Sequence, residues 1–326
     1  MKVLRMLCSL ILVLCVTFTV LVGAKKIDSS GVSADRVEYK GVLSLWQVDS
    51  FEGGAGSRKQ FLLKAARTFE RKNQGVLVMV SQMTEEGVKE KLDSGETPDL
   101  ISFGPGVQIR SMLELSAEKR VKGGVVGNKL FAAAWCRGGY VLIENPAYTK
   151  GEDCVIVSQQ KYTQPLLTLL YGDLRIKEVE ILPPMDAYVK FVSGKAKYLL
   201  GTQRDVVRLE NRGFSYKYKV LDGYNDLYQY VAVTSPDSIK SYYAKEFVEH
   251  LVSDDVQTSL SEIKMLSPYL NVNNGIEALD LMQKTNCKYT VSAFTSCAQL
   301  DQLKNLSLAA LRGDEGSLNK IKNILL

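Results

Sequence analysis

Residues 43–58, LSLWQVDSFEGGAGSR, contain the transition that decides the fold. An apolar strand carries Trp46 towards its end, and two acids, Asp49 and Glu52, follow it. A glycine-rich turn then leads to Ser57, which opens a long amphipathic helix. In α/β proteins ligands bind where a strand gives way to a helix, because backbone N–H groups are free there. The stretch therefore predicts one wall of a binding site.

The elements after this stretch alternate between strand and helix. Ser57 is the expected N-cap of a helix that runs to Asn73, with Gln60 as its capping-box partner. Apolar strands are expected at 76–80 and 100–103, with a short helix between them. Starting from a strand at 42–48, this order predicts an α/β fold with a parallel sheet and right-handed crossovers. Further strands are expected at 131–135, 140–144, 198–202 and 228–234, and further helical segments at 112–115, 165–171, 187–193, 206–211, 236–253, 255–263, 274–284 and over most of 291–325.

The length and composition are those of a globular protein with two modest domains. The chain has 326 residues, of which 46% are hydrophobic and 24% charged. The net charge of +5 comes without a long basic run, so no nucleic-acid partner is expected.

The N-terminal segment has the pattern of a secretory signal peptide, residues 1–24. Basic residues precede a nearly continuous apolar run at 7–21, and small residues then precede cleavage after Ala24. A polar linker is expected at 25–37. An uncleaved anchor is the alternative, and a lipoprotein at Cys15 is a third. All three place the body of the protein outside the cytoplasm.

Four cysteines lie beyond the export segment, and an exported protein could pair them. Cys287 and Cys297 are close in sequence and are the favoured disulfide pair. Four buried thiols are nearly as plausible an arrangement, with Cys136 and Cys154 as the other two. No C-x-x-C motif is present, so neither zinc nor another metal is expected.

The single histidine, His250, excludes several enzyme classes. Neither a Ser-His-Asp triad nor a multi-histidine metal site can be assembled from one histidine. The turn GGAGSRK also lacks the spacing of a phosphate-binding loop that hydrolyses nucleotides. No cofactor is expected.

Four stretches in order resemble the extracytoplasmic solute-binding proteins of ABC importers, of the sugar-binding kind related to maltodextrin-binding protein. They are VMVSQMTEEGVKEKLDSGETPDLISF at 78–103, FAAAWCRGGYVLIEN at 131–145, KAKYLLGTQRDVVRLENRG at 195–213 and SYYAKEFVEHLVSDDVQTSL at 241–260. The resemblance covers nearly all of the chain beyond the export segment. The chain departs from the family pattern in a small second lobe and in the lack of a Trp-rich segment there.

The resemblance implies a periplasmic-binding-protein-like fold of type II, with two lobes and a ligand cleft between them. The expected first lobe is 38–136 plus 234–284, and the second is 139–230 plus 287–326. Hinge strands are expected at 135–140 and 228–234. The implied protein is a monomer that closes on a small ligand and delivers it to a permease.

Aromatic and acidic residues at strand ends are the first candidates for ligand contacts. Trp46 and Trp135 would be platforms for sugar rings, with core packing as an equal alternative for each. Asp49 would accept sugar hydroxyls. Glu52 is also a candidate, although capping the glycine turn or pairing with Arg58 is its favoured role. Arg58 beside the helix N-terminus would otherwise hold a carboxylate or phosphate.

The other candidates face the first set from neighbouring strands. Phe103 ends the third strand and should reach the cleft. The second lobe offers three residues after its strand at 198–202, and the return strand carries two tyrosines on one face. Arg204 would contact vicinal hydroxyls or a carboxylate, unless it pairs with its neighbouring acid. These candidates are Gln203, Arg204, Asp205, Tyr228 and Tyr230.

A glycosidase is the main competing class, with Asp49 and Glu52 as its acid pair. The two acids are three residues apart in one loop, and the sequence shows no carboxylate held opposite to them. A binding protein rather than an enzyme is therefore expected. Its favoured ligand is a mono- or short oligosaccharide, and the alternatives are a small anion or a sensory ligand.

Overall fold

The computed structural model describes residues 39–149, 154–172 and 178–325. The predicted signal peptide, 1–24, and the linker, 25–37, lie outside the described residues, as do Cys8 and Cys15. Within the described ranges, no helix combines the length and the apolar character that crossing a membrane requires.

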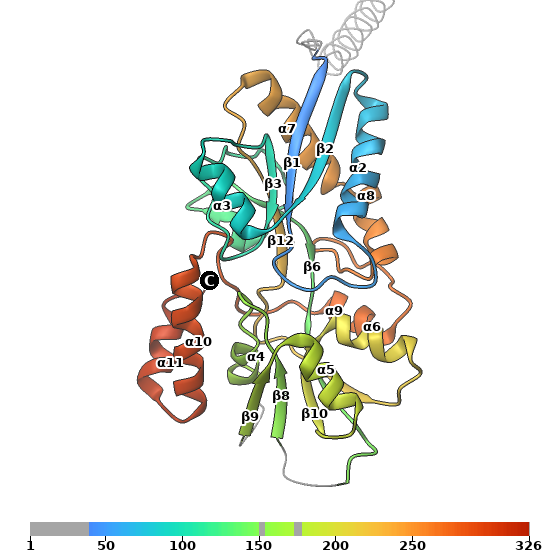
Figure 1. The fold of residues 1–326 in the computed structure, drawn as a ribbon, viewed down its shortest axis with the longest axis vertical. Helices are drawn as coiled ribbons and strands as arrows, with labels where there is room; N and C mark the ends of the chain where they lie inside the picture. Colours follow the sequence, from blue (N-terminus) through green and yellow to red (C-terminus); the bar gives the residue numbers. More distant parts are fainter. Residues whose placement is uncertain (1–38, 150–153, 173–177, 326) are drawn as a thin grey trace, which may run out of the picture. The chain divides into compact units, whose positions relative to one another are not determined.

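A five-stranded sheet of order β2-β1-β3-β12-β6 forms the centre of the first lobe (Figure 1). β1 pairs in parallel with both β2 and β3, so the predicted parallel sheet is confirmed. β12 returns antiparallel between β3 and β6. The bounds are β1 Gly41–Val48, β2 Val76–Met83, β3 Leu100–Phe103, β6 Ala133–Arg137 and β12 Tyr228–Val233, with a small hairpin of β4 Val125–Val126 and β5 Lys129–Leu130 beside them.

A second five-stranded sheet, of order β11-β7-β10-β8-β9, forms the centre of the second lobe. β7 and β10 lie where the sequence predicts strands, whereas β8, β9 and β11 are additional. β9 and β11 are the edges of the sheet. Their residues alternate between polar and apolar over only four or five positions, and the prediction did not use this short period. The bounds are β7 Tyr140–Glu144, β8 Cys154–Ser158, β9 Glu178–Leu182, β10 Tyr198–Thr202 and β11 Lys217–Val220.

Helices cover both sheets, and most lie within a few residues of the predicted positions. Ser57 caps α2 as expected, because its hydroxyl accepts a hydrogen bond from the Gln60 N–H at 3.3 Å. The predicted turn at 112–115 is not helical: Leu115 instead bridges to Leu130. The helices are α2 Arg58–Lys72, α3 Glu85–Asp93, η1 Lys122–Gly124, α4 Leu166–Leu170, α5 Pro184–Val192, α6 Gln203–Asn211, α7 Ser238–Leu251, α8 Asp254–Thr258, η2 Ser259–Ile263, α9 Glu277–Lys284, α10 Cys297–Leu311 and α11 Glu315–Lys322.

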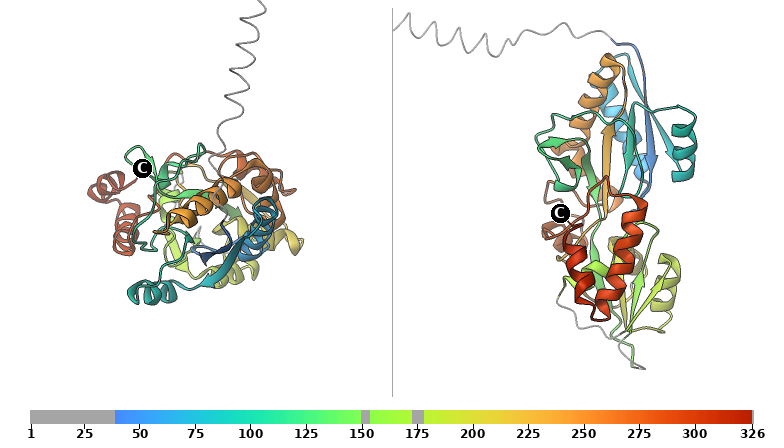
Figure 2. Two further views of the ribbon diagram at one scale, coloured as in Figure 1. Left: turned by 90° about the horizontal axis from the view of Figure 1, so that it is seen from above. Right: turned by 90° about the vertical axis from the view of Figure 1, so that its left-hand side faces the viewer.

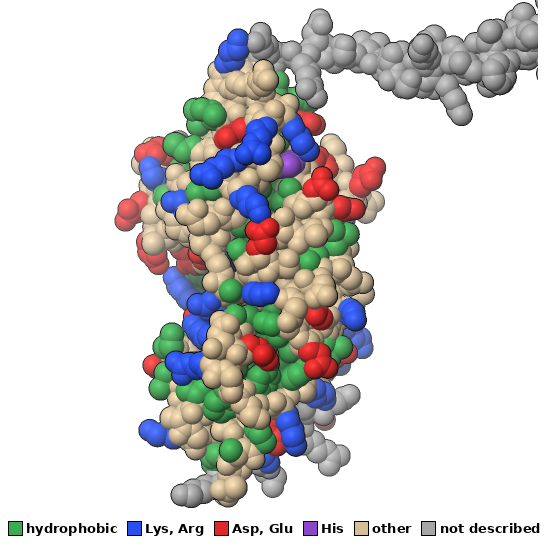
Figure 3. All heavy atoms as spheres, turned by 90° about the vertical axis from the view of Figure 1, so that its right-hand side faces the viewer, with side chains coloured by type: hydrophobic (Ala, Val, Ile, Leu, Met, Phe, Trp, Pro, Cys, Tyr) green, Lys and Arg blue, Asp and Glu red, His purple; other side chains and the backbone are tan. Residues whose placement is uncertain are grey.

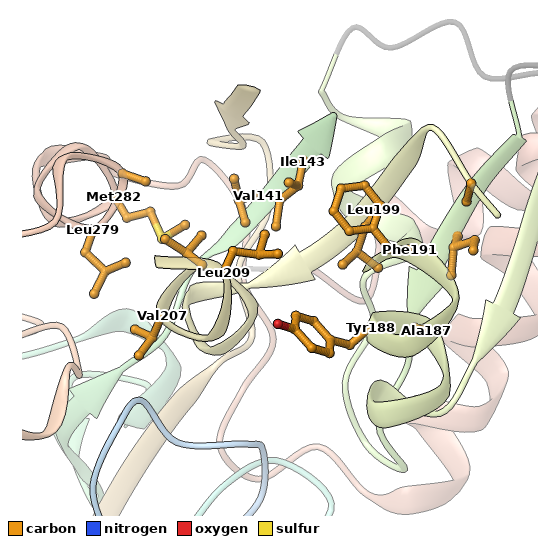
Figure 4. Close-up of a cluster of buried hydrophobic side chains, with 14 of the residues drawn as sticks. Val141, Ile143, Ala187, Tyr188, Phe191, Leu199, Val207, Leu209, Leu279 and Met282 are labelled. Carbon is orange, nitrogen blue, oxygen red and sulfur yellow. The ribbon is translucent and has the colours of Figure 1, made fainter. Parts of the chain in front are cut away.

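The placement of α9 corrects the predicted lobe boundary, which put residues up to 284 in the first lobe. Leu279 and Met282 of α9 belong to the buried cluster of the second lobe, together with Val141 of β7 and Leu209 of α6 (Figure 4). The apolar face of a helix does not specify which core it will cover. The sequence pattern alone therefore could not assign α9 to its lobe.

Three segments cross between the lobes, and a fourth leaves the second lobe and returns to it. Residues 138–139 join β6 to β7, within the predicted hinge at 135–140. Residues 221–227 join β11 to β12, so the second predicted hinge, 228–234, falls on β12 of the first-lobe sheet, after the crossing. Residues 264–276 lead into α9, and residues 285–296 lead from α9 to α10. The last segment passes the first lobe, where the Ala293 N–H donates to the Gly123 carbonyl at 2.8 Å. Within the predicted second-lobe range 287–326, the residues before α10 thus lie against the first lobe.

The C-terminal helices α10 and α11 pack side by side along the second lobe (Figure 2). α10 contacts α4, which agrees with the expected return of the chain across this lobe. On the face that carries α2 and α6, basic and acidic side chains are found in both the upper and the lower parts (Figure 3).

The predicted disulfide between Cys287 and Cys297 is wrong, because all four cysteines at 136, 154, 287 and 297 are free thiols. The Cys287 thiol lies 3.9 Å from the Leu221 carbonyl, and the Cys297 thiol lies 2.9 Å from the Gly106 carbonyl. Each thiol thus faces a different part of the chain. The alternative of four buried thiols holds fully only for Cys136.

Candidate functional site

The loop after β1 is held in place by one buried cation, Arg58, at the start of α2. Its Nε lies 2.8 Å from the Asp49 carboxylate, and its Nη1 donates to the Gln229 amide oxygen at 3.1 Å. Its Nη2 donates to the Phe51 carbonyl, and the guanidinium also lies over the Phe51 ring. Arg58 and Asp49 therefore build the loop, and neither has its charge free for a ligand in this structure.

The same loop touches the second lobe directly. The Glu52 N–H donates to the Gln160 amide oxygen at 2.7 Å, and the Glu52 carboxylate lies 3.0 Å from Nη2 of Arg208. The Gln203 amide donates to the Glu52 carbonyl at 3.4 Å, and Nη1 of Arg204 donates to the Gly54 carbonyl. Gln203 and Arg204 therefore contact this loop directly, through Glu52 and Gly54.

A cavity of about 690 Å³ opens beside this junction and takes residues from both lobes. The first lobe contributes α3, the end of β3 at Phe103, residues 106–110 and Met112. The second lobe contributes Lys161 and Tyr162 after β8, and the start of α10 with the residues before it completes the wall. We refer to this space as the interlobe cavity. It has the volume of a site for a small molecule.

Lys161 connects the two sides of the interlobe cavity. Its ammonium lies 3.0 Å from the Glu85 carboxylate and 3.3 Å from the Glu86 carboxylate, at the N-terminus of α3. A hydrogen bond with Tyr162 and then the pairing with Glu85 raise the pKa of Lys161. Backbone hydrogen bonding and then Lys161 lower the pKa of Glu86. The Lys161 ammonium and the Glu86 carboxylate are therefore charged at neutral pH.

The wall of the interlobe cavity is apolar inside and carries balanced charge at its rim. Three acids and three bases line it, and two sets of them are paired: Lys161 with the glutamates of α3, and Arg110 with Asp93 at 3.2 Å. The apolar residues are Val88, Leu92, Phe103, Val107, Ile109, Met112 and Phe294. This arrangement suits a neutral molecule with one apolar face and several hydroxyl groups.

The two tryptophans lie in the core of the first lobe, not on the surface of the cavity. Trp135 is fully buried, stacks on Phe61 and donates its indole N–H to Ser102 at 2.9 Å. Trp46 is 8% exposed, and the Lys91 ammonium covers its ring. Their position at strand ends is as expected, but their side chains point towards the helices. In this structure both indoles make packing contacts, which is the alternative that the sequence left open for each.

Three further candidates have structural partners. Asp205 caps α6, since its carboxylate accepts from the Thr202 N–H at 2.9 Å. The amide oxygen of Gln203 accepts from the N–H of Gly139, at the first crossing between the lobes, at 3.0 Å. Tyr230 is fully buried near Phe103. In this structure none of the three side chains reaches the interlobe cavity; of the predicted set, only Phe103 is among its lining residues.

Tyr228 lines a different, smaller cavity on the crossing segments. The sequence did not reveal most residues of the interlobe cavity, above all Glu85, Glu86, Lys161 and Tyr162. The unrecognised strand β8 is the reason. The apolar run VIV at 155–157 is followed by SQQKY, and this strand end could have revealed the loop with Lys161. Glu85 and Glu86 could be identified from the sequence only as acidic residues in the first turn of α3.

Within the described ranges, no three His, Cys, Asp or Glu side chains come together as metal ligands would. Two buried acids outside the interlobe cavity are instead held by backbone N–H groups. Asp205 accepts from Thr202, as described, and Asp226 accepts from the Gln164 N–H at 2.7 Å. Burial outweighs these hydrogen bonds and raises the pKa of Asp205 and of Asp226 to about 6 each.

Comparison with known protein families and with curated protein sequences found no match. Solved structures do match over most of the chain, at low identity. The acarbose-binding GacH receptor of Streptomyces glaucescens matches 88% of this chain and 98% of its own, with TM-score 0.58 and 12% identity. The sugar-binding protein MalE from Xanthomonas citri matches 87% and 95%, with TM-score 0.59 and 12% identity.

A third match is the galacto-N-biose- and lacto-N-biose I-binding protein of an ABC transporter from Bifidobacterium longum. It matches 87% of this chain and 95% of its own, with TM-score 0.59 and 11% identity. A GABA receptor also matches, with TM-score 0.58 and 12% identity over 83% and 98%, so this fold serves ligands other than sugars as well. The described part of the chain therefore has the two-lobed, periplasmic-binding-protein-like fold of the solute-binding proteins of ABC importers.

Proposed function

We propose that the protein is an extracytoplasmic solute-binding protein that captures a mono- or short oligosaccharide in the interlobe cavity. The observation that carries this proposal is a cavity of about 690 Å³ whose wall is drawn from both lobes. A ligand that touches both walls binds the closed arrangement better than an open one, which couples binding to closure.

The charges at the cavity favour a neutral ligand over an anion. The acids Glu85, Glu86 and Asp93 balance the bases Lys89, Arg110 and Lys161, so the lining has no net charge. An anion would meet carboxylates at the N-terminus of α3, where a binding site for anions would normally present free N–H groups. Sugar hydroxyls can both donate to the carboxylates and accept from the ammonium groups.

Delivery to an ABC permease is the transport role that the fold supports best, and it places the protein outside the cytoplasm, acting as a monomer. This role needs no chemistry at the site, so the protein is proposed to be a binding protein and not an enzyme. The predicted glycosidase pair has no support in the geometry, since Asp49 is paired with Arg58 and Glu52 with Arg208.

The test is a thermal-unfolding screen with sugars, amino acids and small anions, followed by calorimetric titration of the compounds that stabilise the protein. We expect a neutral saccharide to bind, and Lys161→Gln to weaken it by several fold. Lys129→Gln is the matched control, because Lys129 forms a similar exposed ion pair with Glu114 away from the cavity. Stabilisation by amino acids or anions alone would refute the sugar assignment.

A further inference from the structure

A second cavity, of about 460 Å³, lies where the crossing segments between the lobes come together. Arg137 at the end of β6 and Tyr228 at the start of β12 line it, together with residues 267–271 and 283–287. These residues belong to, or adjoin, the three crossings and the segment that leads from α9 to α10. We refer to this space as the crossing cavity. It is separate from the interlobe cavity, with no lining residue in common.

Arg137 brings a nearly buried positive charge to this cavity, with 6% of its surface exposed. Its Nε donates to the Ser267 carbonyl at 3.2 Å, and its Nη2 donates to the carbonyls of Met282 and Gln283 at 3.0 and 2.9 Å. No carboxylate of the described residues pairs with it, and its Nη1 makes no hydrogen bond with them. One edge of the guanidinium is thus available.

A buried guanidinium without an acid partner is unusual, because buried charges are normally paired. Here the C-terminal carbonyls of α9 compensate part of the charge, and a helix C-terminus carries only about half a negative charge. Lys284 adds a second positive charge at the rim, and the lining residues include no Asp or Glu. The cavity therefore keeps a positive charge that its own residues do not neutralise.

The other groups in the crossing cavity remain uncharged and do not compete with an anion. Burial raises the pKa of Tyr228, although Arg137 opposes the shift. Burial raises the pKa of Cys287 to about 11, with Arg137 opposing and Asp222 and Asp226 adding to the rise. The phenol and the thiol are protonated at neutral pH. The buried hydroxyl of Tyr269, another lining residue, has no hydrogen-bond partner among the described residues.

We propose that the crossing cavity binds a small oxyanion, a carboxylate or phosphate, through the free edge of Arg137 and the ammonium of Lys284. Guanidinium and ammonium groups are the usual partners of such anions. An anion in this position contacts segments that join the two lobes, so it favours one arrangement of the lobes over another. This site does not depend on which ligand the interlobe cavity takes.

The test measures the melting temperature and the heat of titration with inorganic phosphate and with acetate, at constant ionic strength set by chloride. At least one of the two anions should raise the melting temperature of the wild type. Lys284→Gln should weaken binding of that anion about fivefold, which is the upper end of the affinity loss expected on removing one partly exposed charge. Lys219→Gln, an exposed lysine outside the cavity, should bind like the wild type.

Arg137→Lys keeps the charge but loses the planar fork, and it should weaken binding further. If Arg137→Lys does not fold, the anion affinity of Lys284→Gln, compared with that of Lys219→Gln, tests the proposal by itself. The proposal is overturned if neither anion stabilises the protein more than chloride does. It is equally overturned if Lys284→Gln and Lys219→Gln bind the anion with the same affinity, since binding would then be non-specific.

Discussion

Glu52 of the first lobe forms an ion pair with Arg208 of the second, with 3.0 Å between Oε1 and Nη2. The two residues are 156 positions apart in sequence and lie on the β1–α2 loop and on α6. Both side chains are partly buried, at 30% and 15% exposure. This pair, with the neighbouring hydrogen bond from Arg204 to Gly54, holds the lobes together beside the interlobe cavity.

Glu52→Gln should loosen the contact between the lobes and weaken ligand binding. Removing one partner of a partly exposed pair costs about 1 kcal/mol at most, which corresponds to an affinity loss of up to about fivefold. Small-angle scattering should show a larger radius of gyration in the variant without ligand. Glu262→Gln breaks the exposed pair with Lys64 inside the first lobe and should change neither quantity. Equal affinities for the two variants would contradict the role of the pair.

Gly106→Ala should also oppose closure, because the side chain would meet the second lobe. Gly106 has φ of +97°, and a Cβ there would lie 2.8 Å from the ring of Tyr162. Gly95 has φ of +86° with open space around it, so Gly95→Ala carries the same backbone strain without the collision. Both variants should lose similar unfolding free energy from strain, and Gly106→Ala alone should lose ligand affinity. Loss of affinity in both would point to strain as the cause.

Trp135→Ala should destabilise the fold strongly, because the indole is fully buried against Phe61. Truncating a buried tryptophan costs about 3–5 kcal/mol, and Ser102 also loses a hydrogen-bond partner. Chemical unfolding monitored by circular dichroism measures the loss. Trp135→Phe should retain ligand affinity, since the ring is in the core. A variant with normal stability and lost affinity would restore the platform role.

As the pH rises from 5 to 7, the free energy of unfolding of the wild type should fall more steeply than that of the Asp226→Asn variant. Burial raises the pKa of Asp226 to about 6, although the Tyr140 hydroxyl donates to it at 2.7 Å. An unfolded Asp has a pKa of about 3.9, so the folded state holds the proton more tightly in this range. The stability contributed by this proton is present below about pH 4 and is lost as the pH rises through about 6.

Denaturant titrations at pH 5, 6 and 7 measure this difference. Asp222 is exposed, so Asp222→Asn should keep the pH dependence of the wild type. If Asp226→Asn shows the same slope as the wild type, then Asp226 is ionised throughout this range in the folded protein.

The sequence predicted the first lobe well because its signals are local. Long apolar runs separated by Gly75, Gly95 and Pro98 define β1, α2, β2, α3 and β3 within a few residues. The second lobe was harder, since its edge strands β9 and β11 are short and half exposed. Both strands alternate polar and apolar residues, but a run of four or five positions is a weak local signal.

The site was only partly predictable, because it depends on contacts between distant segments. The sequence singled out the loop after β1 and the start of α6, and in the structure Gln203 and Arg204 contact that loop at Glu52 and Gly54. It could not show that Trp46 and Trp135 face the helices, since a strand end does not specify which face a side chain takes in the final packing. Nor could it reveal Lys161, whose partners Glu85 and Glu86 lie 75 residues or more away.

The most direct test of the proposed function is a crystal structure of the protein with the saccharide that stabilises it most. We expect electron density for the sugar in the interlobe cavity, with contacts to α3 or residues 106–110 on one side and to Lys161 or Tyr162 on the other. A saccharide bound to one lobe alone, outside this cavity, would contradict the proposed function.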